Sequence, residues 1–273
     1  MSGHAAAAAI VLVLAGAMPA AAQGLAMPGR DARTPIEVVA RDGIEWRQKE
    51  RVYIARGNAR ATQGEVSVFA DALAASYRQN DSGPTQIYRL EAAGNVRIVS
   101  TTRTAYGNRA VYDVDEGVIV LTGSPRLVTP EQSVTARDSI EYWDRNNMAV
   151  ARGNAVAVGQ GRTLRAEVIT AHFTRAASGE TKLSRVDAVS NVLITTETET
   201  VRGERGVYDL DSGIARLSGG VSITRGENQL TGATAEVNLV TGVSRLVGDG
   251  ASGVRGLLVP REVQRNAPPG RGG

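Results

Sequence analysis

Apolar and polar residues alternate with a period of two along most of this chain. Clear examples are NVRIVS at 95–100, GVIVLTG at 117–123, NVLITT at 191–196 and GVSITR at 220–225. These segments are rich in valine, isoleucine and threonine, which is typical of half-buried strands. No 3.6-residue periodicity follows the N-terminal segment. The pattern therefore predicts an all-β chain of roughly 12 to 16 short antiparallel strands.

The sequence repeats itself after 96 residues. GNRAVYDVDEGVIVLTG at 107–123 returns as GERGVYDLDSGIARLSG at 203–219 with nine of seventeen positions identical, and ARGNA at 55–59 recurs at 151–155. A shorter period of 29 to 37 residues is marked by Gly57, Gly94, Gly123, Gly153, Ser190, Gly219 and Gly248. Such periods are typical of repeat folds, in which each unit buries its apolar face against its neighbours.

The segments DVDEG at 113–117 and DLDSG at 209–213 each stand between two predicted strands. In a hairpin loop of this kind, an aspartate accepts hydrogen bonds from the turn backbone, and glycine adopts a positive φ before the returning strand. The loops resemble calcium loops, but they lack the third acid and the distal glutamate of an EF-hand. We interpret them as turns, with positive φ expected at Gly117 and Gly213.

A comparison of the two copies identifies the inner face of the strands. Leu121 is matched by Leu217, whereas Val120 is matched by Arg216, so the face that carries residue 120 accepts a charge. Alternate residues of one strand share a face. Many residues that this parity places inside are small, and only 4% of the chain is aromatic. We therefore expect two facing sheets with an incompletely filled interior.

The composition excludes several kinds of chemistry. The 273 residues include no cysteine, which rules out disulfides, thiol catalysis and cysteine-bound zinc. His172 is the only histidine beyond the N-terminal segment, and parity places it on the outer face, as a surface residue. No acid pair stands out from a turn or an outer face. The net charge of +3 and the scattered arginines argue against nucleic-acid binding. We predict no enzyme, no cofactor and no metal.

The two ends of the chain differ from the repeats. Residues 1–22 contain an apolar run and an Ala-Ala-Ala site before Gln23, which predicts a signal peptide cleaved after Ala22 and therefore an exported protein. Residues 23–34 form a linker, and residues 35–250 carry the repeats. The Pro/Gly/Arg-rich segment 251–273 is expected to be a disordered tail, with GLLVP as a possible last short strand.

The unit GNRAVYDVDEGVIVLTGSPRLV resembles the motif of the OstA-like family. That motif has a Tyr-Asp pair, a turn with glycine, an apolar residue before a second glycine, and an alternating strand. It is matched at Tyr112–Gly123 and Tyr208–Val221, and more loosely at Tyr77–Gly94 and Tyr142–Gly153. The resemblance covers residues 35–250, and a predicted signal peptide accompanies it.

This resemblance implies an open β-jelly roll of repeated antiparallel strands in two facing sheets. The family includes a periplasmic protein that holds the acyl chains of lipopolysaccharide between its sheets and joins end to end as a bridge between inner-membrane and outer-membrane machinery. Repetition would make the groove a continuous trough. On this resemblance, the lipid-binding residues are Val68, Leu73, Val96, Ile98, Ile119, Leu121, Leu164, Ile169, Val192, Ile194, Leu217, Val221 and Ile223.

The sequence is compatible with three alternatives. A membrane-anchored relative of the same transport system would share the fold and keep residues 5–22 as its anchor. A carbohydrate-active β-repeat enzyme would need an acid pair. A closed structural β-repeat scaffold would bind no lipid in its interior.

A stack of strands has two free edges. The first edge is expected at IEVVA, residues 36–40, and the last near VSRLVG, residues 243–248. Neither contains the lysine or proline that usually protects an edge strand from pairing. Because the two edges differ, pairing of one with the other is heterologous and continues into an open filament. The sequence thus predicts a head-to-tail homo-oligomer, and contact with the membrane components through the same edge strands.

Overall fold

The computed structural model describes residues 35–79, 85–175, 181–238, 240–241, 243–250 and 253–259, and all regular structure in them is β-strand. The predicted signal peptide, the linker and most of the predicted tail lie outside these residues. The strands are β1 Glu37–Val39, β2 Gly43–Arg47, β3 Val52–Gln63, β4 Val66–Arg78, β5 Gln86–Val99, β6 Thr104–Asp113, β7 Val118–Thr122, β8 Arg126–Val128, β9 Gln132–Thr135, β10 Ser139–Trp143, β11 Met148–Gly159, β12 Arg162–Arg175, β13 Thr181–Thr195, β14 Thr200–Asp209, β15 Ile214–Arg225, β16 Asn228–Asn238, β17 Val243–Val247 and β18 Arg255–Leu257.

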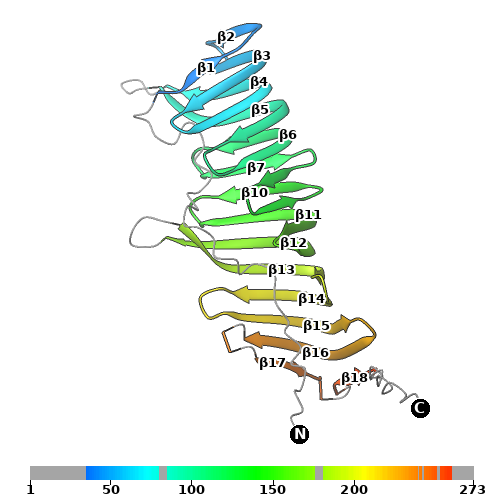
Figure 1. The fold of residues 1–273 in the computed structure, drawn as a ribbon. Coiled ribbons are helices and arrows are strands. Elements are labelled where there is room, and N and C mark those ends of the chain that lie inside the picture. The colour runs from blue at the N-terminus through cyan, green and yellow to red at the C-terminus, as the bar shows by residue number, and fades with distance from the viewer. Residues whose placement is uncertain are drawn as a thin grey trace, which may run out of the picture.

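The strands form one continuous antiparallel sheet that follows the chain order. Figure 1 shows them stacked like the rungs of a ladder, with β2 at the top and β18 at the bottom. Four rungs are interrupted halfway. They are β1 with β2, β7 with β8, β9 with β10, and β17 with β18, and both members of each pair bond to the same neighbouring strand. The described strands number 18 rather than roughly 12 to 16 because these four rungs are each divided in two.

Every second rung bends where two consecutive residues have positive φ. These pairs are Gly57–Asn58, Gly94–Asn95, Gly123–Ser124, Gly153–Asn154, Ser190–Asn191 and Gly219–Gly220. At five of them the pairing register shifts, and the sixth separates β7 from β8. A bulge of this kind bends its strand sharply. The stacked bulges form a crease along the ladder, so the regularly spaced glycines of the sequence mark this crease. Gly248, the seventh marker, has no positive φ.

At two glycines of the crease, Gly57 and Gly153, a neighbouring rung approaches closely. A Cβ on Gly57 would lie 2.3 Å from the carboxyl group of Asp42, and one on Gly153 would lie 2.3 Å from Asp138 Oδ2. These positions are related by the 96-residue repeat. The positive φ also favours glycine, and the one exception among the first members of the six pairs is Ser190, with a φ of 64°. The two ARGNA segments therefore encode a bend rather than a binding motif.

The crease turns the two halves of the sheet toward each other and produces the predicted pair of facing sheets. Residues on either side of one bulge share a core: Leu164 and Ile169 of β12 belong to the same buried cluster, as do Val186 and Val192 of β13. A single-layer sheet would leave this face wet. The described residues contain no helix to cover it, so the cover is the other half of the same sheet. This is an open β-jelly roll.

The interior consists of two buried clusters that follow the duplication. One runs from Val66 to Leu121 with the addition of Tyr142, and the other runs from Ala136 to Val237. Leu127 and Phe173 pack against both clusters, and the rings of Tyr142 and Phe173 lie 6.5 Å apart. The two copies are therefore joined through a shared apolar boundary.

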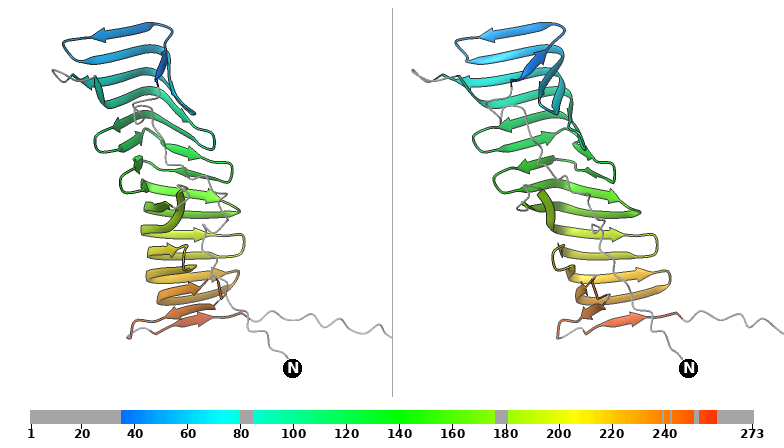
Figure 2. Two further views of the ribbon diagram at one scale, coloured as in Figure 1. Left: turned by 90° about the vertical axis from the view of Figure 1, so that its left-hand side faces the viewer. Right: turned by 60° about the vertical axis from the view of Figure 1, so that its left-hand side comes forward.

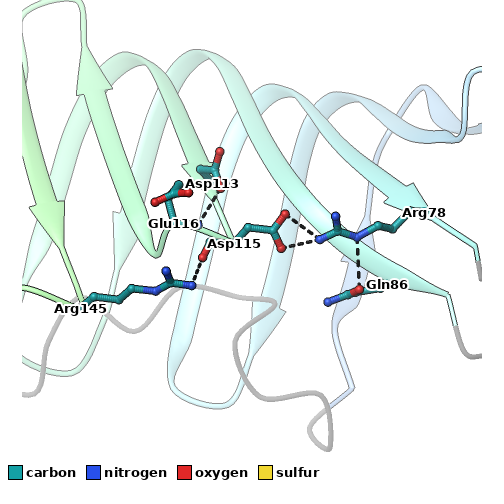
Figure 3. Close-up of polar contacts among 6 residues, drawn as sticks. All are labelled: Arg78, Gln86, Asp113, Asp115, Glu116 and Arg145. Carbon is teal, nitrogen blue, oxygen red and sulfur yellow. Dashed lines mark hydrogen bonds and ion pairs between the residues drawn. The ribbon is translucent and has the colours of Figure 1, made fainter.

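The aspartate-rich loops are turns, as predicted. Asp113 Oδ1 accepts a hydrogen bond from the Glu116 backbone at 2.9 Å, and Gly117 has a φ of 67°. Asp115 binds Arg78 Nη2 at 2.5 Å, and its backbone carbonyl accepts a hydrogen bond from Arg145. Figure 3 shows how these contacts tie the β6–β7 turn to the neighbouring rungs. In the second copy Asp209 likewise accepts from the Ser212 backbone, and Gly213 has a φ of 68°.

Candidate functional site

The first of two apolar cavities lies near the N-terminal end of the ladder, between strands β1 to β6. It has a volume of about 260 Å³, and its lining is almost entirely apolar, with Glu91 as the only charged residue. Glu91 is paired with Arg89 and Arg109, whose hydrogen bonds hold the pKa of its carboxyl group below the ordinary value. The charge is thus neutralised within the sheet, and the cavity presents mainly Val, Leu, Ile, Ala and Tyr.

The central cavity lies between strands β8 and β13, with a contribution from the β5–β6 loop. Its volume is about 300 Å³, and its wall includes Ile140, Ile169 and Phe173. At one side it is bordered by polar residues of two loops, including Arg103 and Glu131. Burial lowers the pKa of Arg103, and the nearby Tyr142 acts in the opposite direction. The cavity therefore combines an apolar wall with a polar border.

The central cavity lies at the lower limit of the range for small-molecule sites, about 300–1,000 Å³, and the first cavity is slightly below it. Each is suited to part of an elongated apolar ligand. The incomplete filling expected from small inward residues is thus present in the structure. The cause is visible at Ala55, Ala61 and Ala75, whose short side chains line the first cavity.

The thirteen residues predicted to bind lipid all face the interior. Twelve are buried, and Leu73 is half-buried. Only Val68 and Leu73 line the first cavity, and only Ile169 lines the central one. The other ten belong to the packed clusters. Their contact with lipid stays a prediction, and the cavities give it most support at these three positions.

Sequence comparison did not select most of the residues that line the cavities. Ala55, Ala61 and Ala151 are small residues on the inward parity of their strands. The signal available in the sequence was the repetition of alanine, rather than of large apolar residues, at inward positions of both copies. Packing decides which inward residue meets open space, and parity alone does not reveal packing.

His172 has an orienting partner that the sequence did not predict. Its Nε2 lies 2.8 Å from Asp187 Oδ2, and Asp187 also binds Arg185. Ser184 Oγ donates to the backbone carbonyl of His172 rather than to its ring, so no nucleophile is linked to the histidine. Across the described residues, no group of three or more His, Asp or Glu side chains is arranged to hold a metal ion.

The two ends of the ladder expose apolar side chains. Of sixteen exposed large apolar residues in the described part of the chain, four lie in the first rung and seven lie in or beside the last. Trp46 in β2 is 54% exposed, and Val243 in β17 is 62% exposed. β1 and β2 pair only with β3, and β17 and β18 pair only with β16. Both rungs therefore have an unpaired edge, at the two places where the sequence predicted one.

The fold and its cavities define an all-β protein with an apolar groove. The family described as "LptA/(LptD N-terminal domain) LPS transport protein" matches this chain twice in tandem, at residues 38–142 and 135–243. The chain belongs to this family, the OstA-like family that the sequence motif indicated. The two matches follow the same division as the two copies and the two buried clusters.

Comparison with solved structures includes LptH from Pseudomonas aeruginosa, described as the LptA-homologous periplasmic component of the conserved lipopolysaccharide transport device. The sequences are 19% identical, the TM-score is 0.42, and the match covers 48% of this chain and 99% of the LptH chain. A comparison with curated proteins gave no match. Within the described residues, no helix is long and apolar enough to cross a membrane.

Proposed function

We propose that this protein is a periplasmic lipopolysaccharide carrier that holds acyl chains in the groove between the two halves of its sheet. Membership of a lipopolysaccharide-transport family supports a transport role. The observation that carries the proposal is the presence of two mainly apolar cavities between the halves of the sheet. The sugars of the lipid would remain in water outside the groove.

The physical basis of binding is the removal of acyl chains from water. Each buried methylene contributes ~0.8 kcal/mol, so ten buried methylenes contribute about 8 kcal/mol before the cost of ordering the lipid. No covalent chemistry is needed. Release toward the next binding site requires only an alternative apolar surface of similar quality.

The same proposal includes assembly and location. The exposed apolar rungs at both ends would pair head to tail and extend the groove from one molecule to the next, as a bridge between the two membranes. Export through the N-terminal segment would place the protein in the periplasm. A membrane-anchored role is the alternative, and sequencing of the N-terminus of the exported protein distinguishes cleavage after Ala22 from retention.

Site-specific photo-crosslinking tests the groove. A photoreactive residue at Leu73 or at Ile169 is expected to capture lipopolysaccharide in cells, because both side chains line cavities. The matched control is Arg97, an exposed outer-face residue whose guanidinium lies 4.1 Å from the Phe69 ring centre. Equal capture at all three positions, or capture at none, would contradict the proposal and favour a closed scaffold.

A further inference from the structure

The two cavities are related to each other by the internal duplication. Adding 96 to the residue numbers of the first cavity converts ten of its sixteen lining residues into residues that line the central cavity. Val38, Ile44 and Ala75 become Val134, Ile140 and Ala171. Since the match extends over five strands, the two cavities are copies of one structural feature rather than two unrelated gaps.

The side chains between the two cavities line neither of them. Ile119 and Leu121 of β7 and Tyr142 of β10 are absent from both linings, are no more than 6% exposed and belong to one buried cluster. The predicted trough is therefore not uniform along the ladder: packed side chains follow the first cavity before the central one begins. An acyl chain seated in one cavity would meet this packed region rather than run freely into the other.

The two copies have also diverged. Tyr53 of the first cavity is replaced by Ala149 in the central one, and Ile36 by Gln132. Tyr53 stacks on Trp46 with ring centres 5.7 Å apart, which places aromatic rings beside the first cavity. The central cavity is bordered instead by polar loop residues, among them Arg103. The first cavity is thus adjacent to the free edge, whereas the border of the central one carries one cation, Arg103, and one acid, Glu131.

We infer that one molecule of this protein has two separate lipid-binding stations, at the first and the central cavity, and holds two lipopolysaccharide molecules at once. This inference rests on the proposed function and specifies its stoichiometry. Each station takes acyl chains of one amphiphile, and the anionic headgroup lies toward Arg103 at the central station. A lipid that moves along the ladder would occupy the first station and then the central one, which are related by the 96-residue repeat.

Native mass spectrometry of the full chain with purified rough-type lipopolysaccharide tests the stoichiometry. Ala75→Phe and Ala171→Phe fill equivalent positions of the first and central cavity and serve as controls for each other. The wild type is expected to bind two lipids, each single variant one, and the double variant none. Circular dichroism and thermal melting check that the variants retain their strands.

A second measurement does not depend on tolerance of the bulky residues. A chain with photoreactive residues at both Leu73 and Ile169 is expected to yield a species crosslinked to two lipids. A wild type that binds one lipid, lost in both single variants, with no doubly crosslinked species, would overturn the two-station inference and leave the carrier function intact. A wild type that binds no lipid would instead overturn the proposed function itself.

Discussion

Asn108 of β6 and Gly123, just after β7, lie opposite each other at the crease: the backbone N–H of Asn108 donates a hydrogen bond to the backbone carbonyl of Gly123 at 3.1 Å. A Cβ on Gly123 would lie 2.5 Å from the Asn108 Cβ, an atom fixed to its own backbone. Gly219 and Glu204 repeat this arrangement 96 residues later, also at 2.5 Å. The bend of the ladder thus depends on the absence of a side chain at these two glycines.

Gly123→Ala is therefore expected to destabilise the protein by about 2 kcal/mol or more, because positive φ and a backbone-fixed clash act together. Gly219→Ala should cause a similar loss. Gly64→Ala is the matched control, since Gly64 has a φ of 57° but no atom within 4 Å of its would-be Cβ. Denaturant unfolding measures all three. Equal losses at Gly64 and Gly123 would show that close approach at the crease is unimportant.

The turn glycines give a second prediction. Gly117→Val places a β-branched residue at a φ of 67°, where the nearest atom to a Cβ is 3.6 Å away. Strain without a clash should lower stability by on the order of 1 kcal/mol or more. Thermal melting compares Gly117→Val with Gly117→Asn. The asparagine variant is the control and should lose less stability, because asparagine tolerates positive φ. Unchanged melting of the valine variant would contradict the hairpin assignment.

Glu141 predicts a dependence of stability on pH. Burial would raise the pKa of its carboxyl group, but hydrogen bonds from Arg152, Ser139 and Trp143 outweigh burial and hold it below 4.5. A lowered folded-state pKa stabilises the fold above pH 4.5, and this contribution is lost as the pH falls through the folded-state value.

Glu141→Gln should accordingly lower the free energy of unfolding at pH 7 by about 1–3 kcal/mol. The loss should be smaller at pH 3. The control is Glu45→Gln, at the equivalent position of the first copy, where the carboxylate is exposed and pairs with Arg47. Its effect should be small, as for other surface ion pairs. Urea unfolding between pH 3 and pH 7 measures both. A loss for Glu141→Gln that does not vary with pH would count against the hydrogen-bonded carboxylate as its cause.

Assembly is tested at the two end rungs. Lysine at an exposed edge opposes strand pairing, so Trp46→Lys or Val243→Lys should shift concentration-dependent oligomers toward monomer. Val158→Lys is the control, because Val158 is 44% exposed but lies mid-ladder in β11. Sedimentation over a wide concentration range is the measurement. A wild-type protein that stays monomeric at all concentrations would exclude the head-to-tail bridge. It would favour a carrier that moves between the membranes as a single molecule.

Proline, which removes a ladder hydrogen-bond donor, tests the first edge more cleanly than the last. Val38→Pro tests the β1 edge, where the side chain is exposed. Leu246 packs against the buried cluster, and its side chain lies over Gly232. Leu246→Pro would therefore damage the core as well as the edge, so lysine at Val243 is the cleaner test of the last rung.

Arg103 predicts a preference for charged lipid at the central station. In an Ala75→Phe background, which leaves only that station open, Arg103→Gln should weaken binding of phosphorylated lipid A about tenfold. Binding of the same lipid without phosphates should hardly change, and Arg103→Lys should retain most of the affinity. Isothermal titration compares the lipids. Equal losses for both lipids would assign Arg103 a structural role only.

The sequence by itself determined the strands, their inner face and the duplication. Period-two alternation is a local property, because successive side chains of a strand point to opposite faces. Leu121 and Leu217 could therefore be placed inside from the charge at Arg216 alone. The aspartate turns were equally accessible, since Asp113 bonds a backbone amide only three residues away.

Only the tertiary structure decided where the sheet bends, which inward residues meet open space and which are packed. The glycine series was visible in the sequence, but its structural role depends on Asp42 and Asn108, which approach from neighbouring rungs. The cavities likewise depend on how the two halves close over small residues such as Ala75 and Ala171. Packing between residues distant in sequence sets both features, and a period along one strand carries no information about the distance to the strand that faces it.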